Sequence, residues 1–207
     1  MSDLYATIQA IVRQELAGQR AAELAVVQQQ HPNAADGDSD NYACTVTLRD
    51  SGLVLRRVPL TTGRLGLASV PDVGDLVLVQ FVGGDLAKPV IVGALYNDEQ
   101  RPPVSQDGQA VLHLPRGAGD GEGVRFEVSS ADRSAVLLTI GEAVSLTLRD
   151  DDPAVELTVD GGAATLTIDR DGSVHIESQA SLALAGADIE IKATGALVLD
   201  GASIDIG

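Results

Sequence analysis

The first cluster of residues in the chain that could form a binding site consists of carboxylates. From Asp36 to Asn41, Asp alternates with Gly or Ser, which is how the ligands of a calcium-binding loop begin. The pattern then fails, because Asn41 stands where the loop needs Gly and Thr47 stands where it needs a bidentate Glu. We therefore expect a solvated loop here and no calcium site.

Two other polar runs are also candidates for binding an ion. The triplet Asp150 to Asp152 lies between two apolar-alternating segments, and three copies around a symmetry axis could attract a cation, but a solvated turn is the simpler interpretation. The glycine-rich run 117–123 places carboxylates where a phosphate-binding loop needs Lys followed by Ser or Thr. We expect a flexible turn.

The histidines and the single cysteine complete no metal or nucleophile motif. His31, His113 and His175 lie far apart in the sequence, and His175 stands between two apolar residues, as on the outer face of a strand. Cys44 has no accompanying His and Asn, so we expect a small buried hydrophobe. The chain also lacks Trp, which a sugar-binding cleft would use. The sequence therefore predicts no enzyme, no metal site and no cofactor.

The charge balance limits the partners. The chain has 14 basic and 30 acidic residues, a net charge of −16, which disfavours nucleic acid and anionic lipid. One cysteine cannot form an intrachain disulfide. The N-terminal segment has charges among its apolar positions, unlike a signal peptide, and no apolar run approaches the roughly 18 residues of a membrane helix. We expect synthesis and folding in the cytoplasm.

Hydrophobic periodicity predicts the elements of the first half. Residues 1–23 form an amphipathic helix, capped by Ser2 or Asp3, with apolar residues from Leu4 to about Leu24 and an interruption at Gly18. Its apolar stripe needs either its own domain or a neighbouring subunit as a partner surface. Residues 24–97 then contain five strand patterns separated by Gly, Asp, Asn and Pro: LAVVQQQ, YACTVTLR, LVLRRVPL, DLVLVQF and PVIVGAL. Five strands in this length fit a small OB-type barrel, among other five-stranded folds.

The second half becomes repetitive. Residues 98–133 are expected to be a linker with two short strands, AVLHL and VRFEV. From 134 to 207, short units alternate apolar and polar residues, and no aromatic residue follows Phe126. The central apolar positions are spaced by 8, 11, 9, 10, 8, 7, 8 and 7 residues: Leu138, Leu146, Leu157, Leu166, Ile176, Leu184, Ile191, Leu199 and Ile206.

Such units leave an apolar face and an unpaired flank that a single chain cannot bury with so short a repeat. We therefore expect an intertwined trimeric β-helix, in which each strand pairs with a neighbouring chain and the nine central residues form the trimer core. The predicted fold is all-β with a short N-terminal α-helix, an OB barrel and then this β-helix.

The segment from Val70 to Pro103 resembles the OB domain of central spike proteins of contractile phage tails, such as baseplate assembly protein V, and of type VI and extracellular injection systems. The matching residues are Pro71, Gly74, Asp75, Phe81, Gly84, Asp85, Pro89, Gly93, Tyr96 and Asn97. The resemblance implies a homotrimeric structural spike whose OB collar meets a baseplate hub protein and whose rod punctures the target envelope, with transient membrane contact.

The family also suggests what lies at the tip. Some members end in an apex that holds iron through an H-x-H motif, whereas others end bluntly and receive a separate PAAR-type tip protein. No H-x-H is present, so the resemblance favours a blunt platform formed by Ile204, Asp205, Ile206 and Gly207.

Two alternatives remain at this point. A trimeric receptor-binding tail fibre or adhesin stalk would need a globular head after the repeat. A monomeric OB-fold nucleic-acid binder would need a basic groove and stacking aromatics. The parent machine, whether phage tail, tailocin or a type VI-like system, is not distinguished by the sequence.

Overall fold

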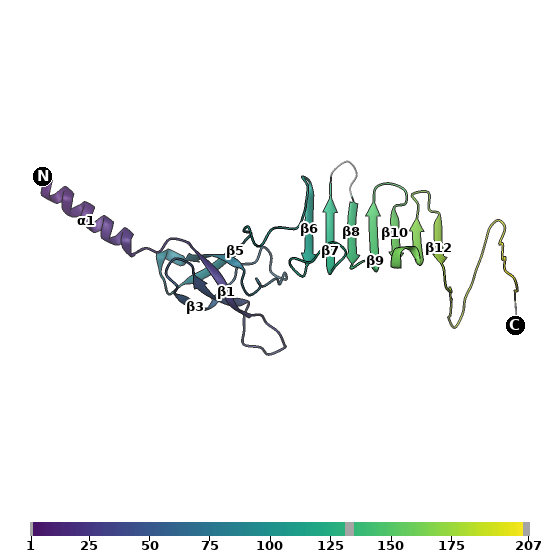
Figure 1. Cartoon of the computed structure of the whole chain (residues 1–207), viewed down its shortest axis with the longest axis horizontal. Helices are drawn as coiled ribbons and strands as arrows, with labels where there is room; N and C mark the ends of the chain where they lie inside the picture. Colours follow the sequence, from purple (N-terminus) through teal and green to yellow (C-terminus); the bar gives the residue numbers. More distant parts are fainter. Residues whose placement is uncertain (1, 131–134, 205–207) are drawn as a thin grey trace. The chain divides into compact units, whose positions relative to one another are not determined.

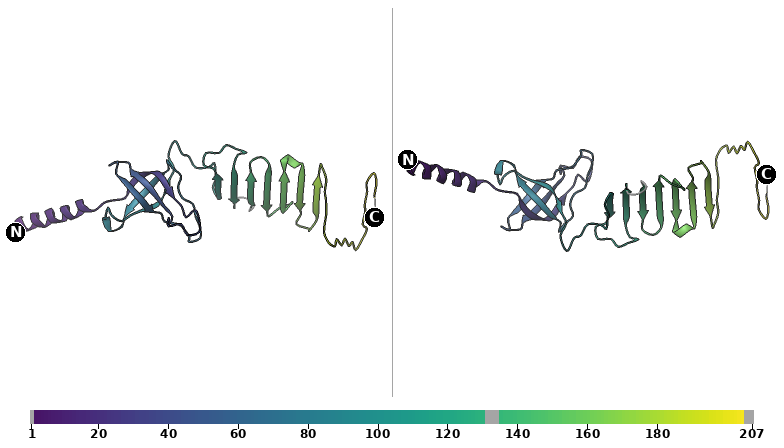
Figure 2. Two further views of the ribbon diagram at one scale, coloured as in Figure 1. Left: turned by 90° about the horizontal axis from the view of Figure 1, so that it is seen from below. Right: turned by 90° about the horizontal axis from the view of Figure 1, so that it is seen from above.

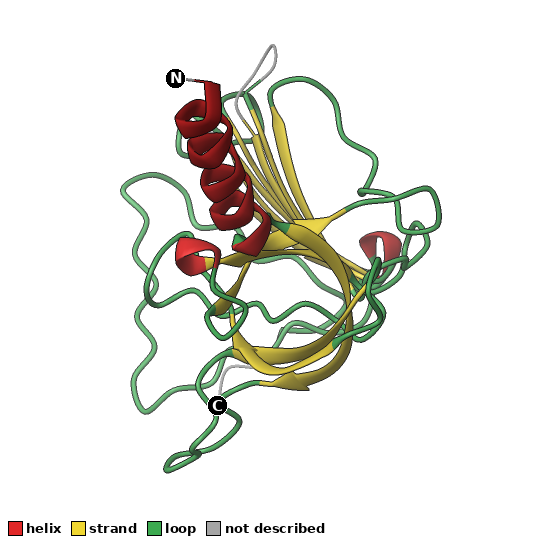
Figure 3. Ribbon diagram, turned by 90° about the vertical axis from the view of Figure 1, so that its left-hand side faces the viewer, coloured by secondary structure: helices red, strands yellow, loops and turns green. Residues whose placement is uncertain are grey.

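The computed structural model describes residues 2–130 and 135–204. The chain divides into two compact units, Met1–Pro102 and Pro103–Gly207. Strands make up most of the regular structure in both (Figure 3), as predicted, and α1 is the one α-helix within the described ranges. No helix in those ranges is both long enough and apolar enough to cross a membrane.

Helix α1 spans Ser2–Gly18 and is shorter than predicted. It ends at the glycine that was expected only to interrupt it, because Gly is a poor helix former and the residues after it enter a strand. Leu24, the expected last residue, already lies in β1. The stripe formed by Leu4, Ile8 and Ile11 is at least half exposed.

The first unit contains the five predicted strands. They are β1 (Glu23–His31), β2 (Ala43–Leu48), β3 (Val54–Pro59), β4 (Leu76–Phe81) and β5 (Pro89–Leu95). They form one antiparallel sheet in the order β3-β2-β1-β4-β5 (Figure 1). A parallel bridge between Leu60 and Ile91 brings the two edge strands together and closes the barrel at one end.

Aliphatic side chains fill this barrel. The sequence alternates in each strand, so one set of residues points inward, and the fully buried members include Val27, Val46, Leu48, Val77 and Ile91. Cys44 is also fully buried, which confirms the prediction of a small buried hydrophobe.

The second unit is a seven-stranded sheet. Its strands are β6 (Gln109–Leu114), β7 (Val124–Ser129), β8 (Ala135–Ile140), β9 (Val144–Arg149), β10 (Val155–Val159), β11 (Ala164–Ile168) and β12 (Val174–Ser178). Each pairs antiparallel with its neighbours in sequence, so the sheet is open and its order is the chain order. Figure 2 shows these strands side by side in a single layer.

This arrangement corrects one expectation. The repeat strands β8 to β12 pair with neighbouring strands of their own chain and form an open antiparallel sheet. A unit of 8 to 11 residues is long enough for a strand of five or six residues and a turn that reverses the chain. The segment expected as a linker, 98–133, contains β6 and β7, which pair with each other, and β7 also pairs with β8. The division between the units falls at Pro102 and not at residue 134.

The last repeats behave differently. Residues 179–204 contain the predicted strand patterns SLALA, DIEIK and ALVLD, but they form no strand in the single chain. Their spacing of seven or eight residues is shorter than that of most units before them. Alternation alone fixes which side chains share a face, but a strand also needs a partner for its backbone groups.

Candidate functional site

The residues of the OB motif mostly shape turns. Gly74 has φ +91°, a left-handed conformation that Gly adopts without strain, and its N–H donates to the carbonyl of Val27 (2.9 Å). A carboxylate oxygen of Asp75 accepts a hydrogen bond from the N–H of Asp72 (2.8 Å). Phe81 is buried in the core, opposite Pro89 of β5. These contacts fix the ends of β4.

The turn at Gly84 and Asp85 holds the chain that precedes β1. Gly84 accepts a backbone hydrogen bond from Arg20 (3.0 Å), and a Cβ on Gly84 would lie 2.9 Å from Cβ of Gln19. Asp85 accepts from the N–H of Ala87, and this bond, followed by the contact with Lys88, lowers the pKa of its carboxyl. The turn therefore needs Gly for close approach and Asp as a cap.

The remaining motif residues lie on or after β5. Gly93 pairs with Leu78 beside an irregularity in the β4–β5 register. Asn97 accepts the N–H groups of Glu99 and Gln100 (2.9 and 2.8 Å), which closes a turn, while Tyr96 is exposed. The motif is thus a set of turn, core and register residues. It brings no acid, base and nucleophile together.

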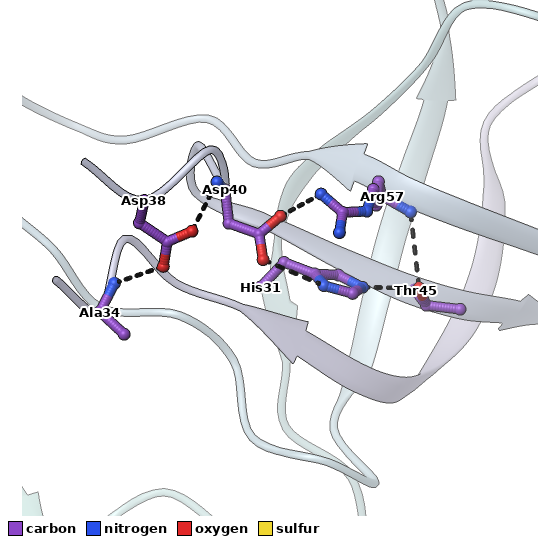
Figure 4. Close-up of polar contacts among 6 residues, drawn as sticks. All are labelled: His31, Ala34, Asp38, Asp40, Thr45 and Arg57. Carbon is purple, nitrogen blue, oxygen red and sulfur yellow. Dashed lines mark hydrogen bonds and ion pairs between the residues drawn. The ribbon is translucent and has the colours of Figure 1, made fainter.

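A ring of four polar side chains crosses three strands of the barrel (Figure 4). His31 of β1 contacts the hydroxyl of Thr45 through Nε2 (2.9 Å) and faces a carboxylate oxygen of Asp40 through Nδ1 (3.7 Å). Asp40 forms an ion pair with Arg57. The backbone N–H of Arg57 in turn donates a hydrogen bond to the hydroxyl oxygen of Thr45 (3.5 Å), which closes the ring. His31 is 7% exposed and lies at the buried side of the ring, whereas Arg57 is exposed.

The ring has a consistent set of donors if His31 is neutral. Nδ1–H then faces the Asp40 carboxylate, and Nε2 accepts the proton of the Thr45 hydroxyl, whose oxygen accepts from Arg57. The ring also explains a bulge, because Arg56 and Arg57 together stand opposite Thr45 in the β2–β3 register. Arg57 itself has φ +50°. The ring therefore anchors a strained edge strand, and no motif in the sequence predicts it.

The calcium-like run, from Asp36 to Asn41, lies in the loop that carries Asp40 of the ring. The carboxylate of Asp38 accepts the N–H groups of Ala34 (3.1 Å) and Asp40 (2.9 Å). These bonds, that of Asp40 first, lower the pKa of the Asp38 carboxyl. The carboxylates thus cap their own loop and pair with Arg57, instead of converging on one point.

The other candidates for chemistry lie apart. His113 contacts the carbonyl of Glu122 (2.9 Å), and the exposed His175 faces Asp169 (3.9 Å). Burial raises the pKa of the Cys44 thiol, which makes it a poor nucleophile. Within the described residues, no group of three or more His, Cys, Asp or Glu could hold a metal ion.

The second unit presents a continuous apolar face. Its central row runs from strand to strand through direct pairs: Leu112 with Phe126, Phe126 with Leu138, Leu138 with Leu146, Leu146 with Leu157, Leu157 with Leu166 and Leu166 with Ile176. Residues two positions to either side are also Val, Leu, Ile or Ala on almost every strand. Five of the nine predicted trimer-core residues thus lie in this one row.

The opposite face of the same sheet is mainly polar. It carries ion pairs between Arg125 and Glu127 (2.8 Å) and between Arg149 and Glu156 (2.5 Å), with Thr158 and Thr165 opposite each other between β10 and β11. One face is therefore suited to water. The apolar face is the part of this unit that calls for a partner.

The rest of the predicted core and platform lies beyond β12. Leu184, Ile191 and Leu199 are 69%, 62% and 62% exposed, and Ile204 is 53% exposed. Ile206, which belongs to both sets, lies outside the described residues, as do Asp205 and Gly207 of the platform.

Comparison with known families gives one match. Residues 49–96 match the family described as the type VI secretion system/phage-baseplate injector OB domain. The matched segment runs from the end of β2 to the end of β5 and contains nine of the ten motif residues, all except Asn97. No curated protein matches the chain.

Proposed function

We propose that this chain is the central spike itself, because residues 49–96 match the type VI secretion system/phage-baseplate injector OB family, a match that indicates a spike or baseplate component. In this proposal three copies assemble into a rod that is driven into the target envelope. The observation that carries it is the uncovered apolar face of the seven-stranded sheet.

The dimensions of the strands favour three copies. Strands of five or six residues span roughly 17 to 20 Å at 3.3 Å per residue. Three such sheets forming a triangular prism would each lie about 5 to 6 Å from the axis, close to half the ~10 Å spacing of packed sheets. One Leu or Val from each sheet fills that space. Four sheets would lie about 9 Å from the axis and leave a hollow, whereas two would leave the sides of their core open.

Residues 179–204 would complete the rod in a different way. Their exposed apolar residues keep the alternation of a strand, but their backbone has no strand partner in the single chain. We propose that they pair with the same segment of the other two copies, as an intertwined β-helix. In this part of the rod, folding and assembly would be one event.

Native mass spectrometry of the full chain tests the assembly. We expect a trimer for the natural sequence and dissociation for Leu157→Asp, which places a carboxylate at the centre of the apolar face. Thr158→Asp is the matched control on the next residue and the opposite face, and it should remain trimeric. A stable monomer of the natural sequence, or equal effects of the two variants, would refute the proposal.

The mechanical role and the partners need separate tests. We propose that the first unit meets a baseplate hub protein, and that the end near Ile204 receives a PAAR-type tip protein. Deleting residues 204–207 should abolish binding of a co-expressed tip protein in a pull-down and leave the trimer intact. Electron microscopy of the parent particle should place the chain at the centre of the baseplate. A peripheral fibre position would favour the receptor-binding alternative.

A further inference from the structure

An open groove lies on the first unit, independent of the proposed trimer. It has a volume of about 690 Å³ and runs between β3 and the segment that connects β4 to β5. One wall is the edge strand β3, and the other is the connecting segment with the start of β5. The Leu60–Ile91 bridge joins the two edge strands at one end only. Along Val54–Pro59, no described residue on the groove side pairs with β3.

The β3 wall offers free backbone groups at a strand's spacing. Leu48 of β2 donates its N–H to Leu53 (2.9 Å), so the next pair, which contains Val54, turns its backbone groups away from β2. By the same alternation, those of Arg56 also point away. Val54 and Arg56 are two residues apart, which is the repeat with which an added strand forms hydrogen bonds.

Apolar side chains lie on both walls of the groove. Val54 on β3 is 50% exposed, and across the groove Val82 and Leu86 are 54% and 37% exposed. Exposed aliphatic residues at an unpaired strand edge are a liability that folded proteins usually protect. A partner that covers both features would remove that liability.

The charge of the groove indicates which partner. Arg56, Arg57 and Lys88 line it, in a chain whose net charge is −16. Arg57 and Lys88 form ion pairs with Asp40 and Asp85. Arg56 forms no ion pair or side-chain hydrogen bond with any residue that the structure describes, so its charge is available to a ligand. A second copy of this acidic chain would add repulsion.

We propose that this groove binds an extended acidic segment of a different protein, which adds a strand to β3. Its backbone pairs with Val54 and Arg56, its aliphatic side chains contact Val82 and Leu86, and a carboxylate pairs with Arg56. Strand addition accounts for affinity through the backbone, and the carboxylate accounts for selectivity.

Fluorescence anisotropy with the full chain tests the proposal. The probes are two labelled octapeptides, one alternating Glu with Val and one alternating Lys with Val. We expect the Glu peptide to bind at least tenfold more tightly than the Lys peptide. Arg56→Glu should weaken the Glu peptide at least tenfold, whereas Arg64→Glu, the same charge change at an exposed site outside the groove, should change binding less than twofold.

A second variant separates strand addition from simple charge attraction. Val54→Pro removes one edge N–H without removing a bond to β2, and it should weaken the Glu peptide at least fivefold while circular dichroism stays unchanged. Absence of binding, equal binding of the two peptides, or insensitivity to Arg56→Glu would each overturn the proposal. A change of subunit number in Arg56→Glu by native mass spectrometry would also overturn it, since the groove would then hold a second copy.

Discussion

Replacing Thr45 by Val should destabilise the barrel although the two side chains have almost the same shape. The hydroxyl is the point where His31 Nε2 (2.9 Å) and the backbone N–H of Arg57 (3.5 Å) meet. Val supplies neither a donor nor an acceptor. His31 would then keep a nearly buried nitrogen without a partner, and the bulge at Arg57 would lose an anchor.

The expected magnitude follows from those two contacts. A buried polar group left without its partner costs about 1 to 3 kcal/mol, and the long bond from Arg57 adds little. We expect a loss of about 2 kcal/mol, which corresponds to roughly a thirtyfold rise in the population of the opened barrel.

Native-state hydrogen exchange measures this population directly. The reporter amides are those of Val27 and Leu48, which donate to Asp75 and Leu53 at 2.9 Å in the core. Thr47→Val is the control on the same strand and the same side, because no side-chain hydrogen bond of Thr47 occurs among the described contacts. It should change the opening free energy by no more than about 0.5 kcal/mol.

The double variant decides whether the loss comes from the contact with His31. Thr45→Val combined with His31→Leu replaces both partners by apolar groups, which relieves the unsatisfied nitrogen. We expect the double variant to lose at least about 1 kcal/mol less than the sum of the single variants. Equal effects of Thr45→Val and Thr47→Val, or strict additivity, would refute the reasoning.

Three further outcomes are expected. Gly84→Ala should lower the unfolding free energy by about 1 to 3 kcal/mol more than Gly83→Ala, because both have positive φ but only at Gly84 would the Cβ meet another segment, at 2.9 Å; thermal denaturation of both checks this. Cys44 should react with a disulfide reagent at least a hundredfold more slowly in the native chain than in guanidinium, because burial raises its pKa; equal rates would contradict its burial. The N–H of Asp40, followed by that of Ala34, lowers the pKa of the Asp38 carboxyl. The contribution of this carboxylate to folding stability is therefore present above its ordinary pKa and is lost as pH falls through the lowered value. Asp38→Asn should flatten the acid limb of the profile of stability against pH.

Local sequence predicted most of the barrel because its strands alternate clearly and Gly or Pro separates them. The polar ring could not be predicted, since it depends on a bulge that brings Arg57 back to Thr45, and nothing in either residue type indicates that register. The burial of His31 depends on the same register. The groove depends on where two edge strands separate, which is a tertiary property.

The alternation of the repeat predicts which residues share a face, but it does not predict which strands pair. Alternation placed Leu138, Leu146 and Leu157 on one face, and the register aligns them in one row. It could not distinguish a partner strand in the same chain from one in another, because both satisfy the same backbone groups. Phe126, which the sequence pattern places in a linker strand, continues this row.

The antiparallel order of β6 to β12 also determines how the length of this sheet can change. Neighbouring strands are about 4.8 Å apart, so the seven strands extend roughly 29 Å between the first and the last. Deleting one strand would make the chain enter every later strand from the opposite end, whereas deleting a hairpin such as β9 and β10 would preserve direction and faces. Length can therefore be gained or lost in increments of about 10 Å, each the product of one in-frame duplication or loss of some twenty codons.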